Sequence, residues 1–205
     1  MKKFTHLFLC AIMIFFLQAC HEAPQPKLSL LSKNAVILAF GDSLTYGTGT
    51  SPNAAYPAVL QKMTGLTVIN AGVPGEETRD SRNRIGEELE KYQPDLVIVC
   101  LGGNDFIRKR DPASVKENLV AIIQTIKKSG AQVILVAVPD FKLSLAVPPL
   151  YSELGTELKV PVDEHIIADL EGKNEMKSDY IHFNAEGYRL LAENIAAFLK
   201  QQHAL

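Results

Sequence analysis

One serine near the start of the chain has the setting of a nucleophile, because it lies in the segment FGDSLT, residues 40–45, directly after an apolar run that begins at Ala35. Such a run is typical of a strand buried on both faces, and open α/β sheets bind their ligands at the carboxyl ends of their strands. We therefore predict that Ser43 is presented at that edge of a sheet. A serine hydroxyl becomes a good nucleophile when a base removes its proton and a third group orients the base.

A base and an orienting group are both present in the segment DYIH, residues 179–182. In a tight turn, Asp179 can accept a hydrogen bond from one ring nitrogen of His182, which leaves the other nitrogen to face Ser43. The alternative is a metal site, for which His165 is the one plausible further histidine. Because no convergent set of cysteines, histidines and aspartates accompanies it, we expect an exposed, polar His165 and a site without metal or other cofactor.

Two segments rich in glycine and asparagine have the composition of oxyanion donors. They are NAGVPG, residues 70–75, and LGGND, residues 101–105, and each follows a strand-like run. Backbone N–H groups and side-chain amides are the usual donors to a developing oxyanion. The alternative for the second segment is a plain strand-ending turn, because glycine and asparagine tolerate unusual backbone angles. Within that segment we expect Asp105 to brace a loop.

These segments need a scaffold that brings their ends together. Apolar runs typical of strands cover residues 35–40, 66–70, 95–101 and 132–138, and a short fifth strand is expected at 160–162. Helical stretches separate the runs, and this alternation predicts a mostly parallel sheet with helices on both faces.

Three helices have recognisable ends or faces in the sequence. Asp111 and Pro112 are typical of a helix start, and Gly130 of its end. Residues 76–92 predict a polar helix, and Asn184 is expected to cap the last helix and so hold the loop of His182 against the sheet. The residues expected to face the core are Val115, Leu119, Ile122, Ile123 and Ile126 in the first helix and Leu190, Leu191, Ile195, Phe198 and Leu199 in the last.

The four segments, in this order, resemble the SGNH (GDSL-type) hydrolase superfamily from about residue 36 to the C-terminus. The resemblance implies a flavodoxin-like, three-layer α/β/α fold with a mostly parallel five-stranded sheet. By position it makes Ser43 the nucleophile, His182 the base and Asp179 its orienting acid. The oxyanion donors it implies are the N–H groups of Ser43 and Gly72 and the side-chain amide of Asn104. In length and in the sequence of these segments, the chain is similar to small cell-envelope thioesterases, lysophospholipases and arylesterases of that superfamily.

The last segment departs from the family pattern, which often has Gly and Pro where this chain has Tyr180 and Phe183. Both Asp179 and His182 are retained. The change affects the backbone of the turn and adds a ring beside the base, so we expect an altered rim and a different substrate preference.

The first residues are an export signal in our interpretation. Lys2 and Lys3 precede an apolar stretch, residues 7–17, that is too short to span a membrane, and Cys20 follows in the manner of a lipoprotein cleavage site. We expect residues 1–19 to be a signal peptide, 20–34 a tether and 35–205 the hydrolase domain. If Cys20 is lipidated, its acyl chains hold the domain at a membrane facing the periplasm. The alternative is ordinary cleavage after residue 19, which exports an unmodified Cys20.

Composition agrees with one exported domain. The chain has 205 residues, 47% of them hydrophobic, and a formal charge of −2, which becomes −4 when Lys2 and Lys3 leave with the leader. Basic residues are not clustered in the sequence, so we do not expect nucleic acid to be a partner. Of the three cysteines, Cys100 lies in a predicted strand and is expected to be a buried hydrophobe, so no disulfide framework is implied.

We predict a hydrolase of acyl esters, lysophospholipids, aryl esters or acyl-CoA that acts through an acyl-serine intermediate. The alternatives are a deacetylase of envelope polysaccharide or peptidoglycan and, outside enzymes, a lipid-anchored binding module. A flavodoxin-like nucleotide binder is disfavoured because no glycine-rich phosphate loop opens a helix. The irregular apolar stretch at residues 138–151 is equally consistent with an acyl groove and with a loop packed on its own domain.

Overall fold

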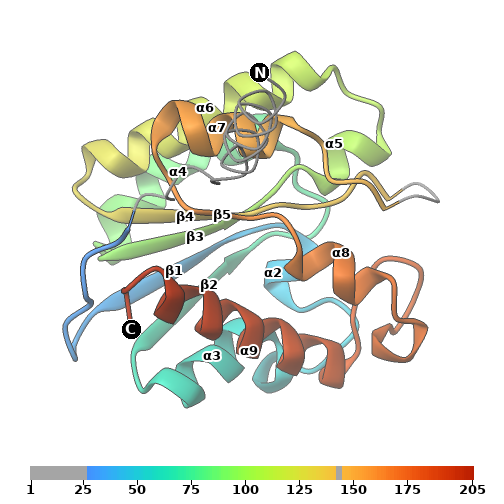
Figure 1. Ribbon diagram of the computed structural model, residues 1–205, viewed down its shortest axis with the longest axis horizontal. Coiled ribbons are helices and arrows are strands. Elements are labelled where there is room, and N and C mark those ends of the chain that lie inside the picture. Colours follow the sequence, from blue (N-terminus) through green and yellow to red (C-terminus); the bar gives the residue numbers. More distant parts are fainter. Residues whose placement is uncertain (1–26, 142–144) are drawn as a thin grey trace, which may run out of the picture.

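The fold is centred on a parallel sheet that runs across the middle of the molecule, between two layers of helices (Figure 1). The computed structural model describes residues 27–141 and 145–205, so the predicted signal peptide, Cys20 and residues 142–144 of the irregular apolar stretch lie outside the described residues. The strands are β1 (Val36–Gly41), β2 (Thr67–Gly72), β3 (Leu96–Cys100), β4 (Gln132–Val136) and β5 (Val162–Asp163). They pair in parallel in the order β2-β1-β3-β4-β5, which confirms the predicted five-stranded sheet.

The sheet is buried on both faces, as its uninterrupted apolar runs predict. Successive side chains of a strand point to opposite faces. In β1, Ile37 and Ala39 join one core cluster, whereas Leu38 and Phe40 join the other. Each face therefore needs its own layer of helices.

Helices supply both layers (Figure 1). One face is covered by α3 (Tyr56–Thr64), α8 (Ile166–Glu171) and α9 (Ala185–Gln201), and the other by α4 (Thr78–Tyr92), α6 (Pro112–Lys128) and α7 (Leu150–Leu158). Two short helices, α2 (Ser43–Tyr46) and α5 (Gly103–Ile107), follow β1 and β3 directly, and 3-10 turns occupy Pro52–Ala54 and Asn174–Met176. The result is the predicted three-layer α/β/α sandwich.

The helix ends that the sequence predicted are confirmed. Asp111 accepts a hydrogen bond from Ala113 N at the start of α6, and Asn184 accepts one from Gly187 N at the start of α9. The predicted core face of α6 is buried throughout, and that of α9 is buried except at Leu190, which is half-buried. The structure adds α3, α7 and α8, which the apolar pattern had not delimited.

The described part of the predicted tether, residues 27–34, is packed against the domain. Leu28 N donates to Gln202 O and Leu31 N donates to Ala204 O, both at 2.9 Å. Ser29 N donates to the side chain of Gln132 at 2.6 Å. The folded unit therefore begins before the predicted boundary at residue 35. Within the described ranges, none of the helices has the length and apolar character needed to cross a bilayer.

The strand order places the chemistry-bearing loops together. β1 lies between β2 and β3, and the chain crosses to opposite faces on leaving it through α3 and on leaving β2 through α4. A switch of this kind opens a crevice at the carboxyl ends of the strands. Ser43 follows β1 and Asn104 follows β3, so both lie at this crevice.

Candidate active site

Ser43 lies at the first position of α2, immediately beyond the end of β1. Asp42 caps this helix, because its Oδ1 accepts a hydrogen bond from Leu44 N at 3.1 Å. The preceding Gly41 allows the close approach of the turn to β3, since a Cβ there would lie 2.5 Å from the carbonyl oxygen of Cys100. The turn presents the Ser43 hydroxyl at the pocket with only 8% of the residue exposed.

His182 and Asp179 lie on a short hairpin between the last 3-10 turn and α9. The hairpin is closed by an antiparallel bridge between Lys177 and Phe183. Phe183, which replaces the family's usual proline, is buried and packs edge-on against Tyr188 with ring centroids 5.6 Å apart. The hairpin is therefore anchored to the core of the domain through an aromatic pair.

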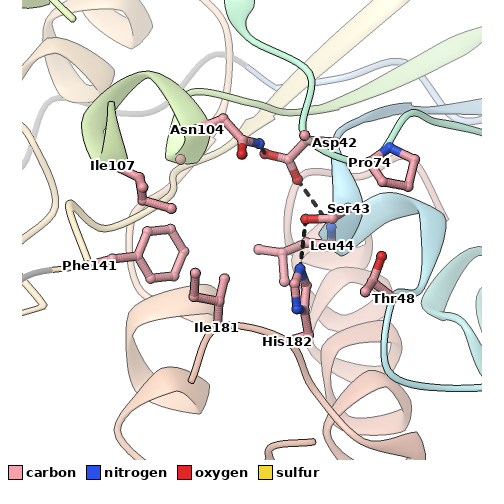
Figure 2. A pocket seen from close by; sticks show the side chains of 12 residues that line it. Asp42, Ser43, Leu44, Thr48, Pro74, Asn104, Ile107, Phe141, Ile181 and His182 are labelled. Atoms are coloured by element: carbon pink, nitrogen blue, oxygen red, sulfur yellow. Dashed lines mark hydrogen bonds between the residues drawn. The ribbon is translucent and has the colours of Figure 1, made fainter. Parts of the chain in front are cut away.

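The three side chains form one hydrogen-bonded line. His182 Nδ1 lies 2.8 Å from Asp179 Oδ2. On the other side of the ring, His182 Nε2 lies 2.9 Å from Ser43 Oγ (Figure 2). An ionised Asp179 makes Nδ1 the protonated nitrogen, so Nε2 is left as the acceptor for the serine proton. This is the arrangement that a serine nucleophile requires.

Asp179 is held as an anion. Its partial burial raises the pKa, but the backbone N–H groups of His182 and Ile181 and the ring of His182 donate to it and lower its pKa to about 2. The same two backbone bonds fix the carboxylate relative to the ring. Asp179 is therefore ionised, and able to orient the ring, whenever His182 is neutral and can act as a base.

Asp42 has the opposite pKa shift. Burial raises its pKa to about 6, against the lowering effect of the bonds from Leu44 N and from the amide of Asn104. Asn104 Nδ2 donates to Asp42 Oδ2 at 3.1 Å. A side-chain amide has two N–H groups, so this bond leaves the second one of Asn104 available at the pocket.

Of the predicted oxyanion donors, the structure brings Ser43 and Asn104 to the pocket but not Gly72. Gly72 N donates to Asn70 Oδ1 at 3.0 Å, and Gly72 is absent from the pocket lining. Gly75 lines the pocket instead, and among the described residues nothing accepts a hydrogen bond from its N–H. The physical reason is the turn after β2, in which Gly75 has a φ of +78°, a left-handed conformation that glycine adopts readily. The adjacent Pro74-Gly75 pair is the sequence signal that points to this turn.

The pocket is a small cavity with one apolar side. It has a volume of about 190 Å³, and Ile107, Phe141 and Ile181 lie together on one side of it (Figure 2). Phe141 belongs to the irregular stretch 138–151, which the sequence left open between an acyl groove and a packed loop. At least this residue of the stretch lines the pocket. Ile107 and Ile181 had no signal of their own, because neither belongs to a periodic pattern.

The other sequence expectations lie outside the pocket. Tyr180 is 96% exposed and lines a separate hollow with Asn174 and Lys177, so its ring does not narrow the active-site pocket. Cys100 is buried, and burial raises its thiol pKa well above the ordinary value, as expected for an inert residue. His165 is exposed at the start of α8, as predicted.

Comparison with known proteins matches this fold and site to one family. The model of the GDSL-like lipase/acylhydrolase family matches residues 39–190. The thioesterase 1/protease 1/lysophospholipase L1 of Escherichia coli (strain K12) is 29% identical over 172 residues, which cover 80% of this chain and 83% of that protein. An arylesterase of Vibrio mimicus is 28% identical over 202 residues, which cover 92% of this chain and 94% of that protein.

A solved structure agrees with the sequence relatives. The crystal structure of TesA superimposes with a TM-score of 0.73 and 25% sequence identity over 82% of this chain and 99% of that one.

Proposed function

We propose, because the chain belongs to the GDSL-like lipase/acylhydrolase family, that Ser43, His182 and Asp179 are its catalytic triad. The chain is a serine ester hydrolase, as its named relatives are esterases and thioesterases. The observation that carries the residue assignment is the unbroken line from Asp179 Oδ2 through the ring of His182 to Ser43 Oγ, with contacts of 2.8 and 2.9 Å.

In the first step, Ser43 Oγ attacks the acyl carbonyl and its proton passes to His182 Nε2. The carbonyl oxygen becomes an oxyanion that accepts hydrogen bonds from the N–H groups of Ser43 and Gly75 and from the amide of Asn104. The first N–H of a helix has no partner within the helix, which makes Ser43 N available for this role. Asp179 stabilises the imidazolium that forms.

To complete the first half, the bond from the acyl carbon to the departing alcohol or thiol breaks and His182 gives its proton to that group, which leaves an acyl ester on Ser43. The second half hydrolyses this ester. Water then attacks this ester while His182 Nε2 accepts its proton. Collapse of the second oxyanion releases the carboxylic acid and gives the proton back to Ser43 Oγ. Each half uses the same donors, so one preorganised pocket serves both.

The apolar side of the pocket supports an acyl group as the moiety bound there. Ile107, Phe141 and Ile181 offer carbon surface and no charge, which suits the acyl part of an ester or thioester. The small volume, about 190 Å³, favours a second candidate as well, namely removal of acetyl groups from an acylated sugar. Both use the same triad.

A substrate panel separates the two candidates. We expect turnover of p-nitrophenyl esters and acyl thioesters across several chain lengths. Ser43→Ala should abolish it because the Ser43 hydroxyl is the group that contacts His182 Nε2. Exclusive activity on acetylated sugars selects the deacetylase. Wild-type turnover by Ser43→Ala contradicts the triad assignment itself.

Asn104→Ala tests the oxyanion assignment. Loss of one donor costs about 100- to 1000-fold in kcat in serine hydrolases. We expect a fall of that size, with KM nearly unchanged, because the bond is made mainly in the transition state. Circular dichroism identical to the wild type shows that the change is local.

For the chain beyond the catalytic domain, we propose export and attachment to a membrane through lipid on Cys20. The support is the sequence pattern of residues 1–20 alone, with its two lysines, short apolar stretch and cysteine. Labelling of cells with a radioactive or clickable palmitate tests this. We expect label on the wild type and none on Cys20→Ala, and an unlabelled wild type contradicts the proposal.

A further inference from the structure

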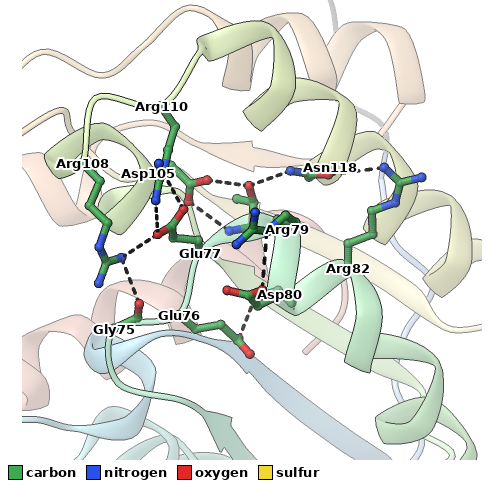
Figure 3. Close-up of polar contacts among 12 residues, drawn as sticks. Gly75, Glu76, Glu77, Arg79, Asp80, Arg82, Asp105, Arg108, Arg110 and Asn118 are labelled. Carbon is green, nitrogen blue, oxygen red and sulfur yellow. Dashed lines mark hydrogen bonds and ion pairs between the residues drawn. The ribbon is translucent and has the colours of Figure 1, made fainter.

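The helix that follows Gly75 is capped by a residue from another loop. Glu77, at the N-cap position of α4, makes no side-chain cap bond. Asp105 does so instead: its Oδ2 accepts from Thr78 N at 3.0 Å, and its Oδ1 accepts from Thr78 Oγ1 at 2.7 Å (Figure 3). Asp105 is 2% exposed and Thr78 is fully buried. The start of α4 is therefore fastened to α5.

The direction of these bonds is fixed by a third residue. Asn118 of α6 donates from Nδ2 to Thr78 Oγ1 at 3.2 Å. A hydroxyl has one proton, so Thr78 accepts from Asn118 and gives that proton to Asp105. The carboxylate thus receives two hydrogen bonds from a single neighbour, which offset part of the cost of its burial.

The fastening joins the two loops that carry oxyanion donors. Asp105 is the residue next to Asn104, and Thr78 lies three residues beyond Gly75. Each donor is therefore separated by only a few residues from the hydrogen bonds between Asp105 and Thr78. A movement of Asp105 away from Thr78 therefore changes the distance between the Gly75 N–H and the Asn104 amide.

Two arginines reinforce the same junction from the segment after α5 (Figure 3). Arg108 Nη1 donates to Gly75 O at 3.0 Å, so it holds the pocket-lining residue that we propose as an oxyanion donor. Arg110 makes two bonds to the carboxylate of Glu77, at 2.7 and 3.1 Å, and Arg108 lies 3.3 Å from the same carboxylate. The hydrogen bond from Arg110 is the main reason that the pKa of Glu77 is lowered. Because the carboxylate is bound to the two arginines, it does not cap α4.

We propose that Asp105 is a positioning residue that sets the separation of the two oxyanion donors, Gly75 N–H and the Asn104 amide, by tying α5 to the first turn of α4. This inference rests on the proposed function, which makes those two groups donors. Oxyanion donors act when they lie about 2.7–3.1 Å from the developing charge. A displacement of about 1 Å in such a site costs on the order of 100-fold in rate.

The test compares Asp105→Ala with a matched control, Asp111→Ala. Asp111 also caps a helix, α6, through Ala113 N, but it is exposed and its bonds stay within α6. We expect Asp105→Ala to lower kcat on a small aryl ester by about 10- to 100-fold with KM within about twofold of the wild type. Asp111→Ala is expected to lower stability, measured by urea unfolding, and to keep the wild-type kcat.

A second variant decides the matter if Asp105→Ala does not fold. Asp105→Asn keeps one oxygen acceptor for Thr78, so we expect it to fold and to have a kcat about 3- to 10-fold below that of the wild type. The rate of phosphonylation of Ser43 by a fluorophosphonate is expected to fall in parallel, because that reaction uses the same donors. A folded Asp105→Ala or Asp105→Asn with wild-type kcat and phosphonylation rate overturns the proposal. That result leaves the proposed function intact, which fails separately if Ser43→Ala remains active.

Discussion

Two aspartates beside the nucleophile show how one residue type serves two purposes. Asp179 is bonded by backbone N–H groups and stays ionised, with a pKa of about 2, so it can orient and stabilise a protonated His182. Asp42 is buried, with a pKa of about 6, and accepts from Leu44 N and the Asn104 amide. The first supports the base, and the second supports the nucleophile turn and an oxyanion donor. Environment, more than residue type, decides each role.

Asp42 makes the stability of the protein depend on pH in a specific window. Its folded pKa of about 6 lies above the ordinary value of 3.8, so between these values the folded state holds a proton that the unfolded state has lost. The free energy of unfolding therefore falls as pH rises from 3.8 to 6, by about 3 kcal/mol in total, and the deficit persists above pH 6.

We expect Asp42→Asn to remove this part of the dependence. The difference in free energy of unfolding between the variant and the wild type should grow from pH 4 to pH 7, in favour of the variant. We also expect kcat to fall, because the Asn104 amide then lacks a carboxylate at residue 42 as its acceptor. Urea unfolding of both proteins across this range measures the difference. Parallel stability curves for the two proteins contradict the assignment of a raised pKa to Asp42.

The choice of Gly75 over Gly72 predicts where an oxyanion binds. In a crystal structure of the protein phosphonylated on Ser43, we expect the phosphonyl oxygen at about 2.7–3.1 Å from Ser43 N, Gly75 N and Asn104 Nδ2. Gly72 N should still donate to Asn70. An oxygen bonded to Gly72 N instead restores the assignment made from sequence position.

At the scale of elements, α9 does more than cover the sheet. Asn184 caps the helix with its oxygen, and its Nδ2 donates to Glu175 O at 2.8 Å and to Lys177 O at 3.4 Å. The same side chain therefore ends the hairpin that carries Asp179 and His182 and begins the helix whose apolar residues join the core cluster on one face of the sheet. The position of the base depends on this junction.

Two substitutions at residue 184 separate capping from hairpin positioning. Asn184→Asp keeps the oxygen acceptor but cannot donate to the two carbonyls, so we expect near wild-type stability and a lower kcat. Asn184→Ala loses both and is expected to lower stability by about 1 kcal/mol as well. Thermal unfolding and steady-state kinetics on the two variants test this, and an unchanged kcat in Asn184→Asp contradicts it.

At the scale of the whole molecule, the site is a product of the sandwich that supports it. Two apolar clusters, one on each face of the sheet, hold the strands whose ends carry Ser43 and Asn104. Ile98, in the central strand β3, is fully buried in one of them. Leu30, in contrast, is 75% exposed.

We expect Ile98→Ala to lower the free energy of unfolding by about 2–5 kcal/mol, because it removes buried carbon and leaves a cavity. Leu30→Ala is the control and should change it by less than about 0.5 kcal/mol. Urea unfolding measures both. A small effect of Ile98→Ala means that the sheet centre is not the packed core described here.

Much of this molecule can be predicted from its sequence, for identifiable reasons. Runs such as 95–101 predict buried strands because parallel strands need apolar residues on both faces, and Asn184 predicts a helix start because of its hydrogen-bonding side chain. The order of the segments then predicts which loops meet. Ser43, His182 and Asp179 are found together for that reason.

The rest depends on three-dimensional packing that no local pattern expresses. Gly72 and Gly75 are equally eligible by composition, and only the backbone turn after β2 decides which of them lines the pocket. The role of Asp105 as the cap of α4 is hidden because donor and acceptor lie on different loops. Phe141 and Ile107 become pocket residues through the approach of two loops, and short helices such as α8 form because the core covers one of their faces.

The most direct test of the central claim is the site of covalent modification by a fluorophosphonate, located by mass spectrometry of the digested protein. The predicted result is one adduct, on the peptide that contains Ser43, formed rapidly by the wild type and very slowly by His182→Ala. An adduct on a different residue, or equal labelling of the two proteins, would contradict the account of a serine activated by His182.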